Sequence, residues 1–238
     1  MQKIELGNIS IDVEQKNIKN IHLSVYPPLG KKVKISAPQR MDLDTIRVFA
    51  ISKLSWIKKQ QERFKNQDRE TPREYLTRES HYFKGKRYLL KVIEHEAKPK
   101  IILKQNEIEL YLRQNTTIKK RQQILNEWYR AELKKIVPKM IKKWEQKIGV
   151  KCHEFGIKKM RTKWGTCNIE AKRIWLNLEL AKKPTECLEY VIVHELVHLL
   201  ERKHNNRFIA FMDEFMPKWR FYKEELNRLP FSHIDWNY

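Results

Sequence analysis

The first part of the chain alternates apolar and polar residues in short runs, which is the pattern of half-buried β-strands. The runs are Ile9–Val13, His22–Tyr26 and Lys32–Ser36, with a turn at 27–30. They predict an antiparallel meander over residues 2–38. From residue 42 to residue 66 the apolar positions follow a helical spacing instead, so we expect one helix there.

Residues 67–80 are polar and charged, and we expect a loop there. The strand candidates that follow it are 88–93 and 100–112. From residue 117 to residue 148 apolar residues recur every three or four positions, which predicts a long amphipathic helix. We expect Pro138 to kink this helix and Gly149 to end it.

The last third of the chain mixes strand and helix patterns. Strands are expected at 155–160 and 173–180, and helices at 184–200, 206–216 and 217–229. The order of elements predicts an α+β fold. We expect a β-rich N-terminal region with one helix, residues 1–115, and a catalytic domain, residues 116–238, with a boundary that falls between residues 80 and 115.

The helix expected over Leu188–Leu200 is apolar on nearly every side and should be buried, yet it carries His194, Glu195 and His198. The two histidines lie four residues apart, so both rings project from one face and can bind one Zn²⁺. Glu195 lies beside the metal, where it can accept a proton from a metal-bound water. This is the H-E-x-x-H motif, so we expect a zincin-like metal-dependent hydrolase domain with Glu195 as general base.

A catalytic zinc usually has three protein ligands and an open position for water. His204, six residues after His198 in a polar segment, is the expected third ligand. Metzincins have this spacing with a glycine where Glu201 stands, and gluzincins use a downstream acid instead. The acidic alternatives are Asp213, Glu214, Glu224 and Glu225. We expect one zinc ion per chain, with nickel or cobalt as alternatives because affinity order alone does not select the metal.

The formal net charge of +21 is spread along the chain. Such a charge attracts polyanions, or it reflects a lysine-rich composition with a solvated surface. Three unpaired cysteines, Cys152, Cys167 and Cys187, are typical of a reducing compartment. The chain has neither the apolar start of a signal peptide nor a run near the roughly 18 apolar residues of a membrane span. We therefore expect a cytoplasmic protein without membrane contact.

The chain resembles the YgjP-like family of predicted metal-dependent hydrolases, related to the WLM and SprT-like zincins. The residues that carry the resemblance are 160–167, 174–178, 190–199, His204, Phe208 and 216–220. The family usually has Arg, Ser, Ser and Asp where this chain has Lys163, Thr166, Asn205 and Lys218. The resemblance implies His194, His198 and His204 as metal ligands and Glu195 as the catalyst. It implies no particular substrate.

Arg161, Lys163 and Trp164 precede a strand that we expect to flank the cleft. A cation in this position would stabilise an oxyanion or bind an anionic substrate. The alternative is that Trp164 packs in the core and Arg161 pairs with an acidic residue.

The leading hypothesis is a zinc metallopeptidase that cleaves a peptide or protein laid beside a strand of the active-site sheet. One alternative is the hydrolysis of an anionic non-peptide substrate such as a nucleoside triphosphate. Another is a DNA-associated protease recruited by its basic surface, whose non-specific binding to nucleic acid would weaken steeply with salt. A purely structural zinc site is the least favoured hypothesis, because such sites commonly use cysteines and these cysteines are not paired with the histidines.

Overall fold

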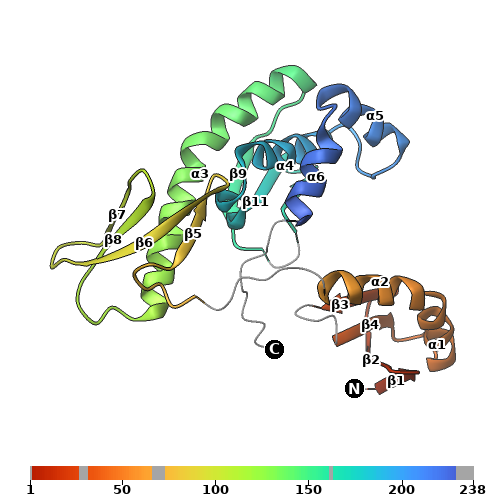
Figure 1. Cartoon of the computed structure of the whole chain (residues 1–238). Coiled ribbons are helices and arrows are strands. Elements are labelled where there is room, and N and C mark those ends of the chain that lie inside the picture. The colour runs from red at the N-terminus through yellow and green to blue at the C-terminus, as the bar shows by residue number, and fades with distance from the viewer. Residues whose placement is uncertain (1, 27–31, 66–72, 161–162, 229–238) are drawn as a thin grey trace. The chain divides into compact units, whose positions relative to one another are not determined.

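The structure is a computed structural model that describes residues 2–26, 32–65, 73–160 and 163–228. Contacts within the chain divide it into two compact units, Met1–Asp68 and Arg69–Tyr238. Helices and sheets occur in both units, with most strands in the first half of the chain and most helices in the second (Figure 1). The predicted α+β class is therefore confirmed.

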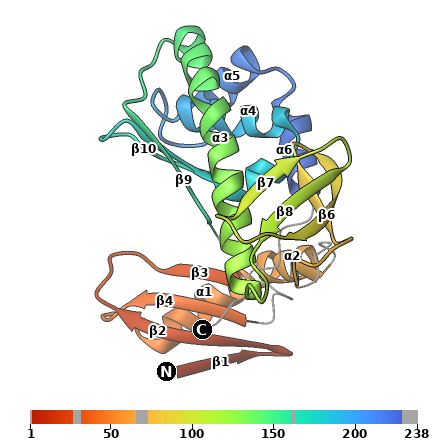
Figure 2. The same cartoon turned by 90° about the vertical axis from the view of Figure 1, so that its left-hand side faces the viewer.

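The N-terminal unit is a four-stranded sheet covered by two helices. Its elements are β1 (Gln2–Leu6), β2 (Ile9–Lys16), β3 (His22–Tyr26), β4 (Lys32–Pro38), α1 (Leu43–Ser52) and α2 (Leu54–Lys65). The strand order is β1-β2-β4-β3 (Figure 2). The apolar residues on one face of the sheet pack against Ile46, Ala50 and Ile57 of the helices.

Two predictions for this unit were wrong. The sheet is not an antiparallel meander, because β2 and β4 pair in parallel. Alternation along a strand shows which side chains are buried but not the direction of the neighbouring strand. The single helix expected over residues 42–66 is two helices, which meet at Lys53, where the amide N–H bonds Ala50 O at 3.1 Å.

The second unit contains two sheets. The first consists of β5 (Ser80–Phe83), β6 (Lys86–Glu94), β7 (Lys100–Leu103) and β8 (Glu107–Leu112), in the order β5-β6-β8-β7. The second consists of β9 (Glu154–Lys158), β10 (Gly165–Asn168) and β11 (Arg173–Asn177), in the order β10-β11-β9. Strands β5 and β10 were not predicted, and β10 forms an edge of its sheet.

The helices of the second unit lie close to their predicted positions. They are α3 (Ile118–Ile148), α4 (Thr185–Val197), α5 (Asn206–Phe215) and α6 (Trp219–Arg228). The 3₁₀ helix η1 (Leu178–Lys182) was not predicted, and it takes up the end of the strand expected over residues 173–180, because β11 already ends at Asn177. Helix α3 continues through Pro138 and ends at Gly149, whose φ of 75° is the left-handed conformation expected of a C-cap glycine. None of the described helices has the length and apolarity needed to cross a membrane.

One hydrophobic core joins both sheets of this unit with α3 and α4. Helix α3 contributes a buried stripe that includes Leu125, Tyr129 and Leu133. Since β5–β8 share this core with α3, the division between the two units lies before these strands. It does not coincide with the expected boundary at residue 115.

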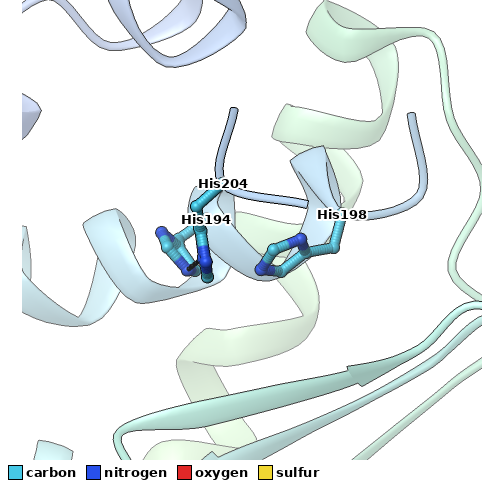
Figure 3. A group of neighbouring side chains, drawn as sticks. All are labelled: His194, His198 and His204. Carbon is cyan, nitrogen blue, oxygen red and sulfur yellow. Dashed lines mark hydrogen bonds between the residues drawn. The ribbon is translucent and has the colours of Figure 1, made fainter. Parts of the chain in front are cut away.

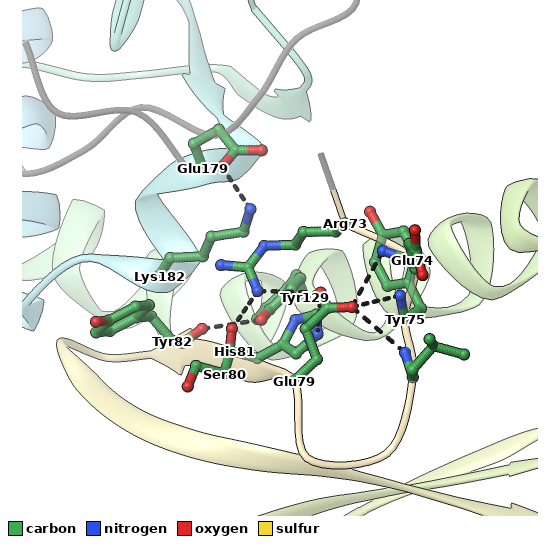
Figure 4. A network of polar contacts seen from close by, with 11 residues as sticks. Arg73, Glu74, Tyr75, Glu79, Ser80, His81, Tyr82, Tyr129, Glu179 and Lys182 are labelled. Carbon is green, nitrogen blue, oxygen red and sulfur yellow. Dashed lines mark hydrogen bonds and ion pairs between the residues drawn. The ribbon is translucent and has the colours of Figure 1, made fainter. Parts of the chain in front are cut away.

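A buried polar network connects the start of the second unit to η1 (Figure 4). Glu79 forms an ion pair with Arg73 at 3.2 Å and accepts the backbone N–H of Tyr75 at 2.6 Å. His81 lies beside this pair and is only 1% exposed. On η1, Lys182 pairs with the buried Glu179 at 2.7 Å. The network thus orders the backbone that leads into β5.

The network makes folding sensitive to acid through His81. Burial, together with the charges of Arg73 and Lys182, lowers the pKa of His81 to about 3. Glu79 Oε1 lies 3.1 Å from His81 Nε2 and favours protonation of this ring. Because Glu79 already forms an ion pair with Arg73, this effect does not outweigh the lowering of the His81 pKa by burial. The unfolded chain, with an ordinary His pKa of 6.5, therefore binds more protons than the folded chain between pH 6.5 and about 3.

We expect the free energy of unfolding to fall as the pH decreases through this window, and to fall less steeply in a His81→Gln variant. The difference in slope corresponds to at most about one proton. Chemical denaturation of both proteins at several pH values within the window measures it. Identical slopes would contradict a neutral buried His81.

Candidate functional site

Helix α4 carries the predicted motif on a buried segment. Nine of its residues are buried, namely Cys187, Leu188, Tyr190, Val191, Ile192, Val193, Glu195, Leu196 and Val197. The helix ends at Val197, and His198 keeps a helical backbone conformation as its C-cap. His194 and His198 therefore remain one turn apart on the same face, as their spacing predicted.

The chain then turns back and brings a third histidine to this face (Figure 3). Asn205 caps α5 by accepting the N–H of Phe208 at 3.0 Å, which places His204 just before that helix. One ring nitrogen each of His194, His198 and His204 lies within 4.8 Å of the others. The Nε2 atoms of His194 and His204 are 3.0 Å apart. The structure thus brings together all three predicted ligands.

The three rings are suited to bind a divalent cation. Burial is the main cause that lowers the pKa of each, to about 3 for His194, so the rings are neutral with free lone pairs. His198 Nδ1 lies 3.1 Å from Glu201 O, a contact that directs its N–H to the carbonyl and leaves Nε2 as the donor atom. Nitrogen ligands of a tetrahedral zinc lie about 3.3 Å apart, given Zn–N bonds of roughly 2.0–2.1 Å. The donor set therefore fits such an ion.

Phe208 of α5 packs against the whole cluster. Its ring centroid lies 5.0 Å from that of His194 and 4.8 Å from those of His198 and His204. It is 2% exposed. An aromatic ring in this position restricts the rotamers of all three histidines. The sequence resemblance included Phe208 but gave it no role, because its contact with the histidines depends on the turn before α5.

Glu195 is 5% exposed and lies against strand β10. Burial raises the pKa of Glu195 to about 8, and the charge of Lys163 acts in the opposite direction. A Cβ atom built on Gly165 would lie 2.5 Å from Glu195 Oε1 and 2.8 Å from its Cγ. Glycine is therefore the residue that lets the carboxyl group rest on the strand. No strand was expected at residues 165–168, so this close approach was not predicted.

A pocket of about 500 Å³ opens on the histidines and Glu195. Lys163 and Trp164, both predicted to be near the site, line it. Lys163 is exposed, whereas Trp164 is half-buried, with Lys183 Nζ 5.6 Å from its ring centroid. Arg161 lies outside the described residues.

The acidic residues considered as alternative third ligands do not join the histidine cluster. Asp213 accepts a hydrogen bond from Trp219 at 2.7 Å and forms an ion pair with Arg220. Glu225 lies 3.7 Å from the Cys187 thiol. Among the described residues, the three histidines are the ones whose ligand atoms lie close enough together to hold a metal ion.

Three neutral imidazoles that converge beside a buried carboxyl group at an open pocket are typical of metal-dependent hydrolases. The family model of the YgjP-like, metallopeptidase domain matches residues 19–229. The chain therefore belongs to the YgjP-like family, and it is a metal-dependent hydrolase of the peptidase type.

Other comparisons add little. Among solved structures, the chain is similar to the metallopeptidase zymogen abylysin of Pyrococcus abyssi, with 16% identity and a TM-score of 0.36. The similarity covers 38% of this chain and 90% of that chain. So distant a similarity establishes neither a common fold nor a common activity. No curated protein matches the chain.

The contact between Gly165 and Glu195 generates a prediction. Replacing Gly165 by alanine forces the Glu195 carboxyl group away from the strand, because three of its atoms would lie within 2.9 Å of the new Cβ. A displacement of about 1 Å at a catalytic group costs roughly 10²-fold in rate. We expect a loss of this order in peptide hydrolysis, with an unchanged metal content measured on the same sample. Full activity in Gly165→Ala would show that Glu195 does not need this position.

Proposed function

We propose that the chain is a zinc-dependent peptidase in which His194, His198 and His204 hold the metal and Glu195 is the general base. The observation that carries the proposal is the convergence of three ring nitrogens within 4.8 Å at the pocket that Glu195 also lines. When bound, a zinc ion lowers the pKa of water and polarises a scissile carbonyl.

The chain's own residues account for the remaining steps. Glu195 accepts the proton of the attacking water and passes it to the leaving amine. The small exposed fraction of this carboxyl group limits competition from bulk solvent. The contact between His198 Nδ1 and Glu201 O holds the imidazole in one tautomer.

The edge of β10 supports a peptide as the substrate. Asn177 N donates to Trp164 O at 2.9 Å, so these two residues form a hydrogen-bonded antiparallel pair. Such pairs alternate along a ladder, and the backbone groups of Gly165 and Cys167 therefore point away from β11. Both residues line the pocket. No other described strand pairs with these groups, so an extended peptide can pair with them and place its carbonyl carbon beside Glu195.

The metal is the first part of the proposal to test. We expect about one divalent ion, mainly zinc, per purified chain, and a several-fold lower content in His198→Ala, which loses one of three ligands. Mass-spectrometric metal analysis of both proteins measures this. A variant that retains the full metal content would remove His198 from the ligand set, and nickel or cobalt in place of zinc would correct only the identity of the metal.

The role of Glu195 is tested separately. Glu195→Gln keeps the shape of the side chain but cannot accept a proton, so we expect normal metal content and about 10²–10⁴-fold slower peptide hydrolysis. Turnover of a peptide library by the metal-loaded proteins is the measurement. Equal turnover by the wild-type protein and the variant would contradict the role of Glu195 as general base.

Two alternatives stay predictions. The first alternative is the hydrolysis of an anionic non-peptide substrate, and a panel of nucleoside triphosphates incubated with the metal-loaded protein tests it. Phosphate release that a chelator abolishes would favour this alternative over peptide cleavage. The second alternative is recruitment to DNA through the net charge of +21, and it predicts DNA binding that weakens steeply with salt. Binding that persists at high salt would argue against this electrostatic origin. The cytoplasmic location expected from the sequence also stays a prediction.

A further inference from the structure

The entrance of the pocket is rich in positive charge. Lys163 and Arg202 line it and are exposed, and Glu195 is the one acidic residue in its described lining. These two cations come from separate segments of the chain. A bound divalent metal would add to the positive potential, so the entrance favours an anionic group.

Arg202 occupies a particular place among these cations. A second pocket of about 510 Å³ adjoins the first, and Arg202 lines both of them. The second pocket is otherwise lined by Cys167–Glu170 and His198–Leu200. Because Cys167 also lines both pockets, a peptide that follows the edge of β10 from one pocket to the other passes Arg202.

The Arg202 guanidinium has no ion pair or hydrogen bond within the described part of the chain. Some other exposed arginines of this unit do have such partners, as Arg220 does with Asp213 and Arg113 with Glu96 O at 2.9 Å. The neighbouring Glu201 accepts the N–H of Lys203 at 3.1 Å instead. The donors of Arg202 are therefore available to a ligand where the two pockets adjoin.

We propose that Arg202 binds a carboxylate of the peptide substrate, close to the scissile bond, and so selects acidic peptides. The proposal rests on the peptidase function proposed above. A planar guanidinium can bind both oxygens of a carboxylate, which gives this pairing direction as well as strength. The carboxylate comes either from a Glu or Asp side chain or from the C-terminus of the substrate. The backbone groups of Gly165 and Cys167, which pair with no strand in the described part of the chain, favour a peptide over a nucleotide as the molecule that carries this charge.

Matched peptides test the selection. Each pair differs only by Glu or Gln at one position within three residues of the cleaved bond. At the position that meets Arg202, we expect at least a tenfold higher kcat/KM for the Glu peptide. Free and amidated C-termini, in peptides without acidic side chains, form the second arm. A preference for the free C-terminus alone would assign the subsite to the terminal carboxylate.

Variants assign the preference to Arg202. Arg202→Gln should abolish the Glu/Gln ratio, and Arg202→Glu should invert it. Lys203→Gln is the matched control, because Lys203 is an exposed cation one residue away that lines neither pocket. It should keep the ratio. Unchanged metal content in each variant shows that the adjacent histidines are intact.

Binding separates this proposal from the peptidase function. Fluorescence anisotropy with Glu195→Gln measures the affinity for the same labelled peptides without cleavage. Tighter binding of the Glu peptide supports the subsite if the additional substitution Arg202→Gln in the Glu195→Gln protein removes this preference. This holds even if the wild-type protein cleaves no peptide, in which case only the proposed peptidase function fails. Equal affinities for both peptides, or an equal loss in Lys203→Gln, overturn the Arg202 subsite. The absence of any peptide binding overturns both proposals.

Discussion

A buried carboxyl group and two half-buried imidazoles on an otherwise apolar helix are the constraint on which the second unit depends. Such groups are costly to bury without partners. Glu195 is accommodated because Gly165 leaves room on β10, and the histidines are accommodated because the turn after α4 adds His204 and packs Phe208 against all three rings. Both sets of contacts come from segments outside α4, namely β10, the turn before α5 and α5 itself, so these segments and α4 together form the site.

This arrangement places three chemical resources at one pocket. The imidazoles present lone pairs that could hold a cation, and Glu195 presents the carboxyl group to which we assign the role of general base. The edge of β10, which pairs with no other described strand, presents backbone groups to the pocket. Membership of the YgjP-like family agrees with this combination and makes the chain a metal-dependent hydrolase of the peptidase type. Arg202 adds a cation where two pockets meet, so the same site can bind a charged substrate as well as cleave it.

The outer parts of the fold were harder to predict than the site. The long helix α3 was predicted to within a residue, because its apolar spacing persists over many turns and Gly149 ends it. In contrast, the parallel pairing of β2 with β4 left no local pattern, since the alternation of each strand is the same for either direction. Strands β5 and β10 were missed because each is only four residues long, too short to show an alternating pattern.

The sequence by itself determined the chemistry on α4. The helical period places His194 and His198 on one face and Glu195 beside them, and this follows from spacing alone. The tertiary structure decided what surrounds that face: the approach of Gly165 to Glu195, the packing of Phe208 against three rings, and the position of Arg202 between two pockets. The physical reason is that a helix repeats over four residues, whereas these contacts join segments whose proximity depends on the packing of the whole unit.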